Sequence, residues 1–379
     1  VWGGGCCDGL ICGRAVYLRK KSPAGGVAAA AFSIDMYDIS NYKIKPEPVI
    51  LGLESSCDET ACAVIKGRRL LSNCIISSAA EQAKYGGVVP EIASRAHTEA
   101  VEEVTSRAIA EAGIALSDID AVAVTYGAGL LGALLVGLSF AKGLAYALNV
   151  PLIAVNHIRG HLAAAYLDDP SLKPPFITLL ASGGHTAILK TTSFTRFEVL
   201  ARTLDDAAGE AFDKCARVLG LPYPGGPHVQ RAAEGGSPSI DFPSAQVRHS
   251  SSLAFSYSGL KTAVINYCHN LAQKGREVNV ADVAASFQRA AIEPLVENTV
   301  RLAVQSGITT VTAGGGVIAN GYLRSRLSEE CKKAGLKLVL PAVKFCTDNA
   351  AMIASEGLNK YMTGDFAPLS VNATAHIPL

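Results

Sequence analysis

The chain has little net charge and few aromatic side chains. Its 34 Lys and Arg nearly balance 33 Asp and Glu, for a formal net charge of +1 over 379 residues, and aromatic residues make up only 6%. This composition offers neither a broad basic surface nor an array of stacking rings, the features by which a stand-alone protein holds single-stranded RNA. Nucleic acid is not excluded as a partner, because a local basic patch would suffice.

Long apolar runs and dense cysteine clusters are also missing. We find no apolar run long and clean enough to span a membrane, and we expect no membrane partner. The ten cysteines are scattered, which suits a reduced cytoplasmic protein better than a disulfide scaffold. Cys6, Cys7 and Cys12 lie close together but lack the spacing of a metal site. Hydrophobic residues make up 49% of the chain, enough to build the cores of two domains.

Residues 1–35 differ in composition from the rest. They are rich in Gly, Ala and Cys, with several basic and few acidic residues. Three interpretations are open: an organelle transit peptide, a disordered tail, or translated upstream sequence, since the chain begins with Val and its first Met is Met36. We favour the last and leave this leader out of the fold prediction. The body is then expected in the cytoplasm, whereas a transit peptide would direct it to mitochondria or plastids.

From residue 49 onward, predicted strands and helices alternate. Twice a strand, a short polar or glycine turn and a second strand open an α/β half, at 49–65 and at 176–189. This duplication predicts an α/β fold of two related lobes around a nucleotide cleft, as in actin, sugar kinases and heat-shock chaperone ATPases. The first lobe is predicted over residues 48–155, and the second, with an inserted helical segment, over 156–379. Further strands are predicted at 121–125, 152–155, 309–313 and 336–340, and helices at 91–112, 130–148 and 348–360.

His157 and His161 follow the predicted strand at 152–155. On a helix, residues four apart lie on the same face, where two imidazoles can bind one metal ion. Two polar residues at a helix start explain the pair equally well. The metalloprotease motif H-E-x-x-H carries its general base after the first His, and here that position is Ile158. Peptide hydrolysis is therefore disfavoured.

A literal G-x-G-x-x-G motif occupies residues 127–132. A dinucleotide site also requires an acidic residue about twenty positions later, where this chain has Asn149 and Asn156 and no acid before Asp168. We interpret these glycines as a tight turn from a strand into a closely packed helix.

Three further segments are candidates for chemistry, each with a structural alternative. Residues 182–186 combine glycines, which permit close backbone approach, with the hydroxyl donor of Ser182. The structural alternative is a plain hairpin turn. Residues 205–214 carry four carboxylates, which form either a functional cluster or the solvated face of a helix. Residues 314–316 are a glycine run that can lie against a base or ribose. Asp348 is either the N-cap of the last predicted helix or the carboxylate of a two-His, one-Asp metal site.

Taken together, these segments resemble the TsaD family, the tRNA adenosine threonylcarbamoyltransferases. The resemblance covers the chain from about residue 48 to the C-terminus and leaves out residues 1–35. The matching stretches are residues 53–60, 156–161, 182–186, 206–214, 223–227, 255–262 and 347–352.

The resemblance implies an activity and a set of site residues. Threonylcarbamoyl-adenylate would be the donor, and the adenosine 3′ of the anticodon, in tRNAs reading codons that begin with A, would be the acceptor. The ligands of one divalent metal per subunit, usually iron with zinc also seen, would be His157, His161 and Asp348. The adenylate would lie against Leu180, Ala181, Ser182, Gly183, Gly184, Asp213, Gly226 and Asn320. A paralogous TsaB-type subunit and a small TsaE-type ATPase would be protein partners.

The proton-transfer group is less well defined. Asp58 and Glu59, on the first predicted hairpin, are the best candidates for handling the proton or orienting the donor. The chain departs from the family pattern at Arg159, which should point away from the His face, and at Gln230, where many relatives carry an acid that contacts the ligand. The alternatives are an ATPase or small-molecule kinase of the same fold, a metalloprotease and a non-enzymatic scaffold.

Overall fold

The computed structural model describes residues 10–12, 15–21, 27–32, 37–249 and 252–377. The chain forms two compact units, Val1–Lys43 and Ile44–Leu379. In the first unit, β1 (Leu10–Cys12), β2 (Ala15–Lys21) and β3 (Val27–Phe32) form an antiparallel sheet. These strands lie in the leader that we left out of the fold prediction, and the origin of the leader stays a prediction.

The second unit begins with a five-stranded mixed sheet. Strand β5 pairs antiparallel with both β4 and β6. Strand β7 pairs parallel with both β4 and β8. Every residue of β4 is buried, as expected for a central strand covered on both faces. In sheet order the strands are β6 (Arg69–Ser77), β5 (Glu59–Lys66), β4 (Val49–Glu54), β7 (Ala121–Gly127) and β8 (Leu152–Asn156).

A seven-stranded sheet follows and repeats this topology. Its strands β11, β10, β9, β14 and β15 have the same order and the same relative directions as the five strands of the first sheet. Strands β12 and β13 extend it beyond β11. The strands are β9 (Phe176–Ala181), β10 (Thr186–Ser193), β11 (Arg196–Thr203), β12 (Gln246–His249), β13 (Ser252–Phe255), β14 (Thr310–Gly314) and β15 (Lys337–Val339). The duplication predicted from the sequence is confirmed.

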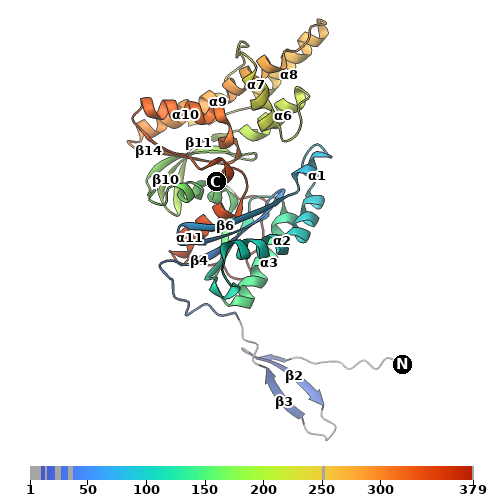
Figure 1. Ribbon diagram of the computed structural model, residues 1–379, viewed down its shortest axis with the longest axis vertical. Coiled ribbons are helices and arrows are strands. Elements are labelled where there is room, and N and C mark those ends of the chain that lie inside the picture. The colour runs from blue at the N-terminus through green and yellow to red at the C-terminus, as the bar shows by residue number, and fades with distance from the viewer. Residues whose placement is uncertain (1–9, 13–14, 22–26, 33–36, 250–251, 378–379) are drawn as a thin grey trace, which may run out of the picture. The chain divides into compact units, whose positions relative to one another are not determined.

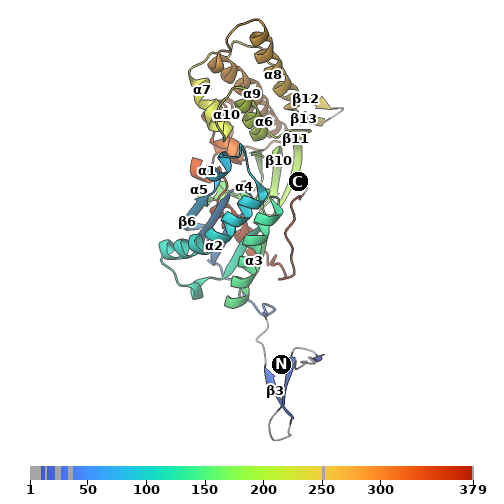
Figure 2. The ribbon, with the colours of Figure 1, turned by 90° about the vertical axis from the view of Figure 1, so that its right-hand side faces the viewer.

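Helices pack against both sheets (Figure 1, Figure 2). Helices α2 (Pro90–Ala112) and α3 (Leu131–Leu148) pack on the first sheet, and α9 (Val280–Gln305) packs on β9 and β14 of the second. The long helix α9 is absent from the sequence prediction. Further helices of the second lobe are α5 (Ala165–Asp168), α6 (Ala208–Val218), α7 (Gly225–Glu234), α8 (Ser258–Gln273) and α10 (Gly321–Lys333).

The last helix, α11 (Ala350–Tyr361), packs on the first sheet although it lies within the range predicted for the second lobe. It contacts β4, β5 and β7 on one side and α4 (His157–Ala163) on the other. Gly52 permits this packing, because a Cβ there would lie 2.7 Å from the carbonyl oxygen of Ala350. The chain therefore returns to the first lobe after completing the second.

Helix α3 differs from the expectation that no apolar run is long enough to span a membrane. By length and composition alone, residues Leu131–Leu148 form a helix long and apolar enough to cross a membrane. Core helices of soluble proteins pass the same test, so a single such helix is weak evidence for a membrane span. In this structure α3 packs against α2 and β7, and a third of its apolar window is buried.

Candidate active site

The two histidines lie at the carboxyl end of β8. Asn156 ends this strand and caps α4, because its side-chain oxygen accepts a hydrogen bond of 2.8 Å from the backbone N–H of Ile158. His157 and His161 therefore occupy successive turns of α4 on one face, with ring centroids 4.7 Å apart.

Asp348 completes a three-residue cluster. Its Oδ1 lies 3.4 Å from the Nε2 of His157 and 3.4 Å from the Nε2 of His161. One potential ligand atom from each of the three residues lies within 4.8 Å of the others. The structure thus brings together all three residues expected to bind metal, from α4 and from the segment before α11.

The cluster fits a divalent cation. Both ring nitrogens of His161 are buried and make no hydrogen bond to any described residue. An unpaired buried polar group costs about 1–3 kcal/mol, so an imidazole of this kind calls for a partner. Two imidazoles and one carboxylate form a ligand set typical of iron and zinc.

Asn349, rather than Asp348, is the N-cap of the last helix. The Asn349 side-chain oxygen accepts a hydrogen bond of 3.0 Å from the backbone N–H of Met352. The N-cap interpretation of Asp348 is therefore wrong. Because its neighbour caps α11, the carboxylate of Asp348 is left to face the two imidazoles.

Glu54 holds His157 from the other side, and the sequence analysis did not single it out. Its Oε2 lies 3.1 Å from the Nδ1 of His157 and accepts a hydrogen bond of 2.6 Å from the hydroxyl of Thr125. A carboxylate on Nδ1 leaves Nε2 free to bind metal. The sequence feature that could have pointed to Glu54 is its position within the family-matching stretch at residues 53–60.

The charges of the cluster stabilise one another. Burial raises the pKa of Asp348, but the imidazoles of His157 and His161 outweigh it and hold this pKa well below its usual value. Burial lowers the pKa of His157, and the carboxylates of Asp348 and Glu54 overcome that effect and raise it. Burial lowers the pKa of His161. A neutral His161 beside an ionised Asp348 suits metal binding, whereas a metal must displace a proton from His157, whose pKa is raised.

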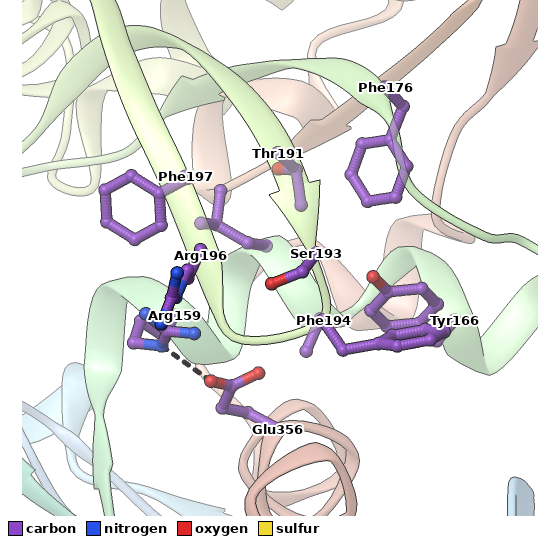
Figure 3. A pocket seen from close by; sticks show the side chains of 11 residues that line it. Arg159, Tyr166, Phe176, Thr191, Ser193, Phe194, Arg196, Phe197 and Glu356 are labelled. Atoms are coloured by element: carbon purple, nitrogen blue, oxygen red, sulfur yellow. Dashed lines mark hydrogen bonds and ion pairs between the residues drawn. The ribbon is translucent and has the colours of Figure 1, made fainter.

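Arg159 points away from the cluster, as its helical position predicts. Its Nε donates a hydrogen bond of 2.6 Å to the buried carboxylate of Glu356 on α11, and its guanidinium lies over the ring of Phe197 (Figure 3). The cavity at this place measures about 10 Å³, room for a single water and not for a substrate. Arg159 thus joins α4 to α11 without contacting the metal ligands.

A larger cavity of about 480 Å³ lies in the second lobe. Four of the eight residues expected to contact the adenylate line it, namely Gly183, Asp213, Gly226 and Asn320. Gln230, at the position where the family pattern is broken, also lines it and accepts a hydrogen bond of 2.9 Å from the backbone N–H of Gly321. The volume falls in the range of small-molecule sites.

The other four expected residues lie next to the cavity rather than in its lining. Leu180 and Ala181 are fully buried in β9. Ser182 closes the hairpin, because its Oγ accepts a hydrogen bond of 3.1 Å from the backbone N–H of His185. The turn function that we considered for this segment is therefore present, and adenylate contacts at these positions and at Gly184 stay a prediction.

Glycines join the metal cluster to the cavity. A Cβ at Gly314 would lie 2.2 Å from the carbonyl oxygen of His161, and one at Gly315 would lie 2.3 Å from that of Ala181. The next residue, Gly316, lines the cavity. Only glycine allows such close backbone approach. The run at 314–316 therefore extends from the backbone of the metal-ligand helix α4, past the end of β9, to the wall of the cavity.

Two of the cavity residues also have structural roles. Asn320 caps α10 by accepting a hydrogen bond of 3.0 Å from the backbone N–H of Leu323, and its amide nitrogen donates to Gln288 at 2.9 Å. Asp213 accepts a hydrogen bond of 2.7 Å from the backbone N–H of Gly225, and burial raises its pKa. These bonds fix the orientation of both side chains at the cavity wall.

Asp58 ends the turn after β4, and Glu59 is the first residue of β5. Ser78 donates both its backbone N–H and its hydroxyl to the carbonyl oxygen of Asp58, and the hydroxyl of Ser77 donates to Glu59 at 3.2 Å. Burial, a hydrogen bond with Asp58 and the charge of Asp348 raise the pKa of Glu59 to about 9. Glu59 therefore holds its proton at neutral pH.

A protein-family comparison identifies a close match for this chain. The model of the TsaD family, described as tRNA N6-adenosine threonylcarbamoyltransferase, matches residues 69–355. A protein with that description from Clostridium botulinum is 50% identical over 332 residues, which are 87% of this chain and 97% of the relative. Another from Clostridium perfringens is 49% identical over 333 residues, 87% of this chain and 98% of the relative.

Solved structures support the fold. Full-length HypF in its phosphate- and nucleotide-bound form superposes with a TM-score of 0.57 at 16% identity, over 84% of this chain and 47% of HypF. HypF from T. kodakarensis gives a TM-score of 0.58 at 16% identity, over 85% of this chain and 48% of HypF. The chain spans about half the length of HypF, and at this identity the likeness concerns the fold alone. The predicted fold class, two related α/β lobes, is confirmed.

Proposed function

Because the chain belongs to the TsaD family of tRNA N6-adenosine threonylcarbamoyltransferases, we propose that it modifies tRNA in this way. The threonylcarbamoyl group passes from threonylcarbamoyl-adenylate to N6 of the adenosine 3′ of the anticodon, in tRNAs that read codons beginning with A, and AMP is released. The observation that carries this proposal is the cluster of His157, His161 and Asp348, which lies beside a nucleotide-sized cavity within the matched range.

The cavity is the proposed donor site. The AMP part of the donor lies against Gly183, Asp213, Gly226 and Asn320, with the end of β9 and the turn after it, residues 180–184, beside it. Glycines at this wall let backbone N–H groups approach the phosphate closely. In this proposal the activated end of the donor points toward the metal ligands, and the run at 314–316, which packs against the backbone of His161, supports that orientation.

The transfer forms one bond and breaks another. The N6 nitrogen attacks the carbamoyl carbon, a C–N bond forms, and the C–O bond to the phosphate breaks with its electron pair leaving on AMP. The amine loses one proton, which passes to a base. Adenine's amine is a weak nucleophile, so positioning and charge stabilisation supply much of the acceleration.

The residues of the first hairpin handle that proton in this proposal. Glu59 is protonated at neutral pH, because its pKa is raised to about 9, and it donates a hydrogen bond rather than accepting a proton. Asp58, beside it on the turn, is the proposed acceptor. A divalent cation held by His157, His161 and Asp348 supplies Lewis acidity and a template for the donor when bound. We propose iron for this site, with zinc as the alternative.

Partners and compartment are further parts of the proposal. The near-neutral composition lacks a stand-alone RNA-binding surface, so we propose that a paralogous TsaB-type subunit and a small TsaE-type ATPase assist turnover. The isolated chain is then expected to turn over weakly and to be rescued by those partners. We propose a cytoplasmic location, with mitochondria or plastids as the alternative if residues 1–35 are a transit peptide.

Mass spectrometry of tRNA nucleosides tests the activity. The chain, its bound metal, threonylcarbamoyl-adenylate and unmodified tRNA are incubated together, and the nucleosides are analysed for N6-threonylcarbamoyladenosine. One equivalent of AMP should appear per modified adenosine. Phosphoryl transfer from ATP without tRNA, and no modified nucleoside, would instead favour a kinase or ATPase of the same fold.

A further inference from the structure

Residues 78–89, here called the strap, connect β6 to α2 and begin beside the turn that carries Asp58. Ser78 anchors the start of the strap on the carbonyl oxygen of Asp58. The short helix α1 (Ala79–Ala83) follows, and α2 begins at Pro90. The strap therefore begins at the hairpin that carries the proposed proton-transfer residues.

The strap reaches the second lobe beside the donor cavity. The Nη2 of Arg217 on α6 lies 3.4 Å from the carbonyl oxygen of Gly86 and donates to it. Arg217 stands one helical turn after Asp213, which lines the cavity. Figure 1 shows α1 and α6 facing each other from the two lobes. The strap thus links the turn that carries Asp58, the proposed base, to the helix that carries Asp213 of the proposed donor site.

Internal bonds hold the strap in shape. Gln82 is fully buried, and its side-chain oxygen accepts a hydrogen bond of 2.8 Å from the backbone N–H of Val89. Gly86 and Gly87 have φ values of +74° and +156°, in the region that favours glycine. A Cβ at either glycine would meet nothing within 4 Å. The backbone beside Tyr85 therefore has a defined conformation, and no other atoms crowd it.

Tyr85 projects from this segment into solvent. It is 59% exposed, the most exposed aromatic side chain among residues 37–247 and 253–377, followed by Tyr146 at 44% and Phe194 at 36%. A ring this exposed is free to stack against an incoming ligand. Lys84 and Arg217 flank it as exposed cations, although Lys84 pairs with Glu81.

We propose that Tyr85 is a stacking platform that positions the acceptor base. This inference rests on the proposed function, in which the acceptor is an adenine in a single-stranded loop. Such a base must leave the loop stack before its exocyclic amine can meet the donor, and unstacked RNA bases are commonly held on aromatic rings. Tyr85 acts by positioning and takes no part in bond making.

Fluorescence of a labelled RNA tests this inference without the donor. An anticodon stem-loop carrying 2-aminopurine at the acceptor position is titrated with the full-length, metal-loaded chain. We expect quenching by the wild type and by Y85F and Y85W, because both variants retain a ring. Y85A should lose the quenching and bind the stem-loop about 10-fold more weakly, as expected for one stacked base.

Y146A is the matched control. Tyr146 is also an exposed tyrosine, but it belongs to α3 rather than to the strap, 15 residues and about 22 Å along the helix from its first residue. It should behave as wild type. Equal quenching by the wild type and Y85A, or no quenching by the wild type, would overturn the inference. Failure to form modified nucleoside despite normal quenching would instead contradict the proposed function, so the two failures are distinguishable.

Discussion

The Oε2 of Glu54 lies 3.1 Å from the Nδ1 of His157, while the Nε2 of the same ring faces Asp348 at 3.4 Å. Glu54 is 1% exposed, and its other oxygen accepts a hydrogen bond of 2.6 Å from the backbone N–H of Ser56. The imidazole of His157 is thus oriented from behind by a carboxylate that is itself held in place. This relationship joins the first sheet to the proposed metal site.

Replacing Glu54 with Gln should weaken metal binding. The amide retains the size of the side chain but removes the charge that orients His157, and loss of such a partner typically costs about 10- to 100-fold in metal affinity. Competition with a chelator of known affinity measures the change. Glu293→Gln, at an ion pair with Arg326 on α10, is the control and should bind metal as wild type. Equal affinities of the Glu54 variant and wild type would contradict the role of Glu54.

Removing a metal ligand should abolish metal binding and transfer together. His157→Ala, His161→Ala and Asp348→Asn each delete one member of the cluster, so we expect losses above the roughly 100-fold limit for a supporting residue. Elemental analysis and nucleoside mass spectrometry measure the two effects. Asp365→Asn, at an exposed pair with Lys360, is the control. Full metal occupancy in a His157→Ala, His161→Ala double variant would rule out this cluster as the site.

Gly314→Ala should damage both stability and the site. The added Cβ would lie 2.2 Å from the carbonyl oxygen of His161, so α4 or β14 must shift. Such overpacking costs about 1–3 kcal/mol, and it displaces a proposed ligand. Gly143→Ala on α3 is the matched control, since its Cβ meets nothing within 4 Å and should stabilise the helix by about 0.5–1 kcal/mol. Denaturant unfolding and metal titration measure both, and an unperturbed Gly314 variant would refute the contact.

Glu293 should contribute to stability only above acidic pH. Burial raises its pKa, but hydrogen bonds from Arg326 and Tyr322 outweigh that effect and lower it. Because the folded-state pKa is lowered, the contribution is present above the unfolded pKa of about 4.3 and is lost as pH falls through the folded value. Glu293→Gln should cost about 1–2 kcal/mol at pH 7 and less at pH 3. Thermal unfolding of both proteins between pH 3 and pH 7 measures this cost. Glu329→Gln, at the more exposed partner of Arg326, is the control and should cost less. A pH-independent cost would contradict the ion pair.

Periodicity and motifs predicted most elements of the sheets that build the site. Short continuous apolar runs placed the strands now described as β4, β7, β8 and β9 within one or two residues, because each run reports the burial of one local segment. The long helix α9 was missed. It is buried on most of its surface and carries Pro294, so it lacks both the amphipathic stripe and the uninterrupted pattern of a typical helix.

What the sequence alone determined about this protein is local: which segments become strands and helices, that the opening pattern recurs, and that His157 and His161 share one helix face. It also carried the motifs by which the family was recognised. The tertiary structure decided which of these surfaces meet. In the folded chain Asn349 is the N-cap of α11, so Asp348 faces the histidines, and Glu54 contacts the Nδ1 of His157. The tertiary structure also returned α11 to the first sheet and brought the strap to α6. These contacts depend on packing between segments far apart in the chain, and no local periodicity encodes them.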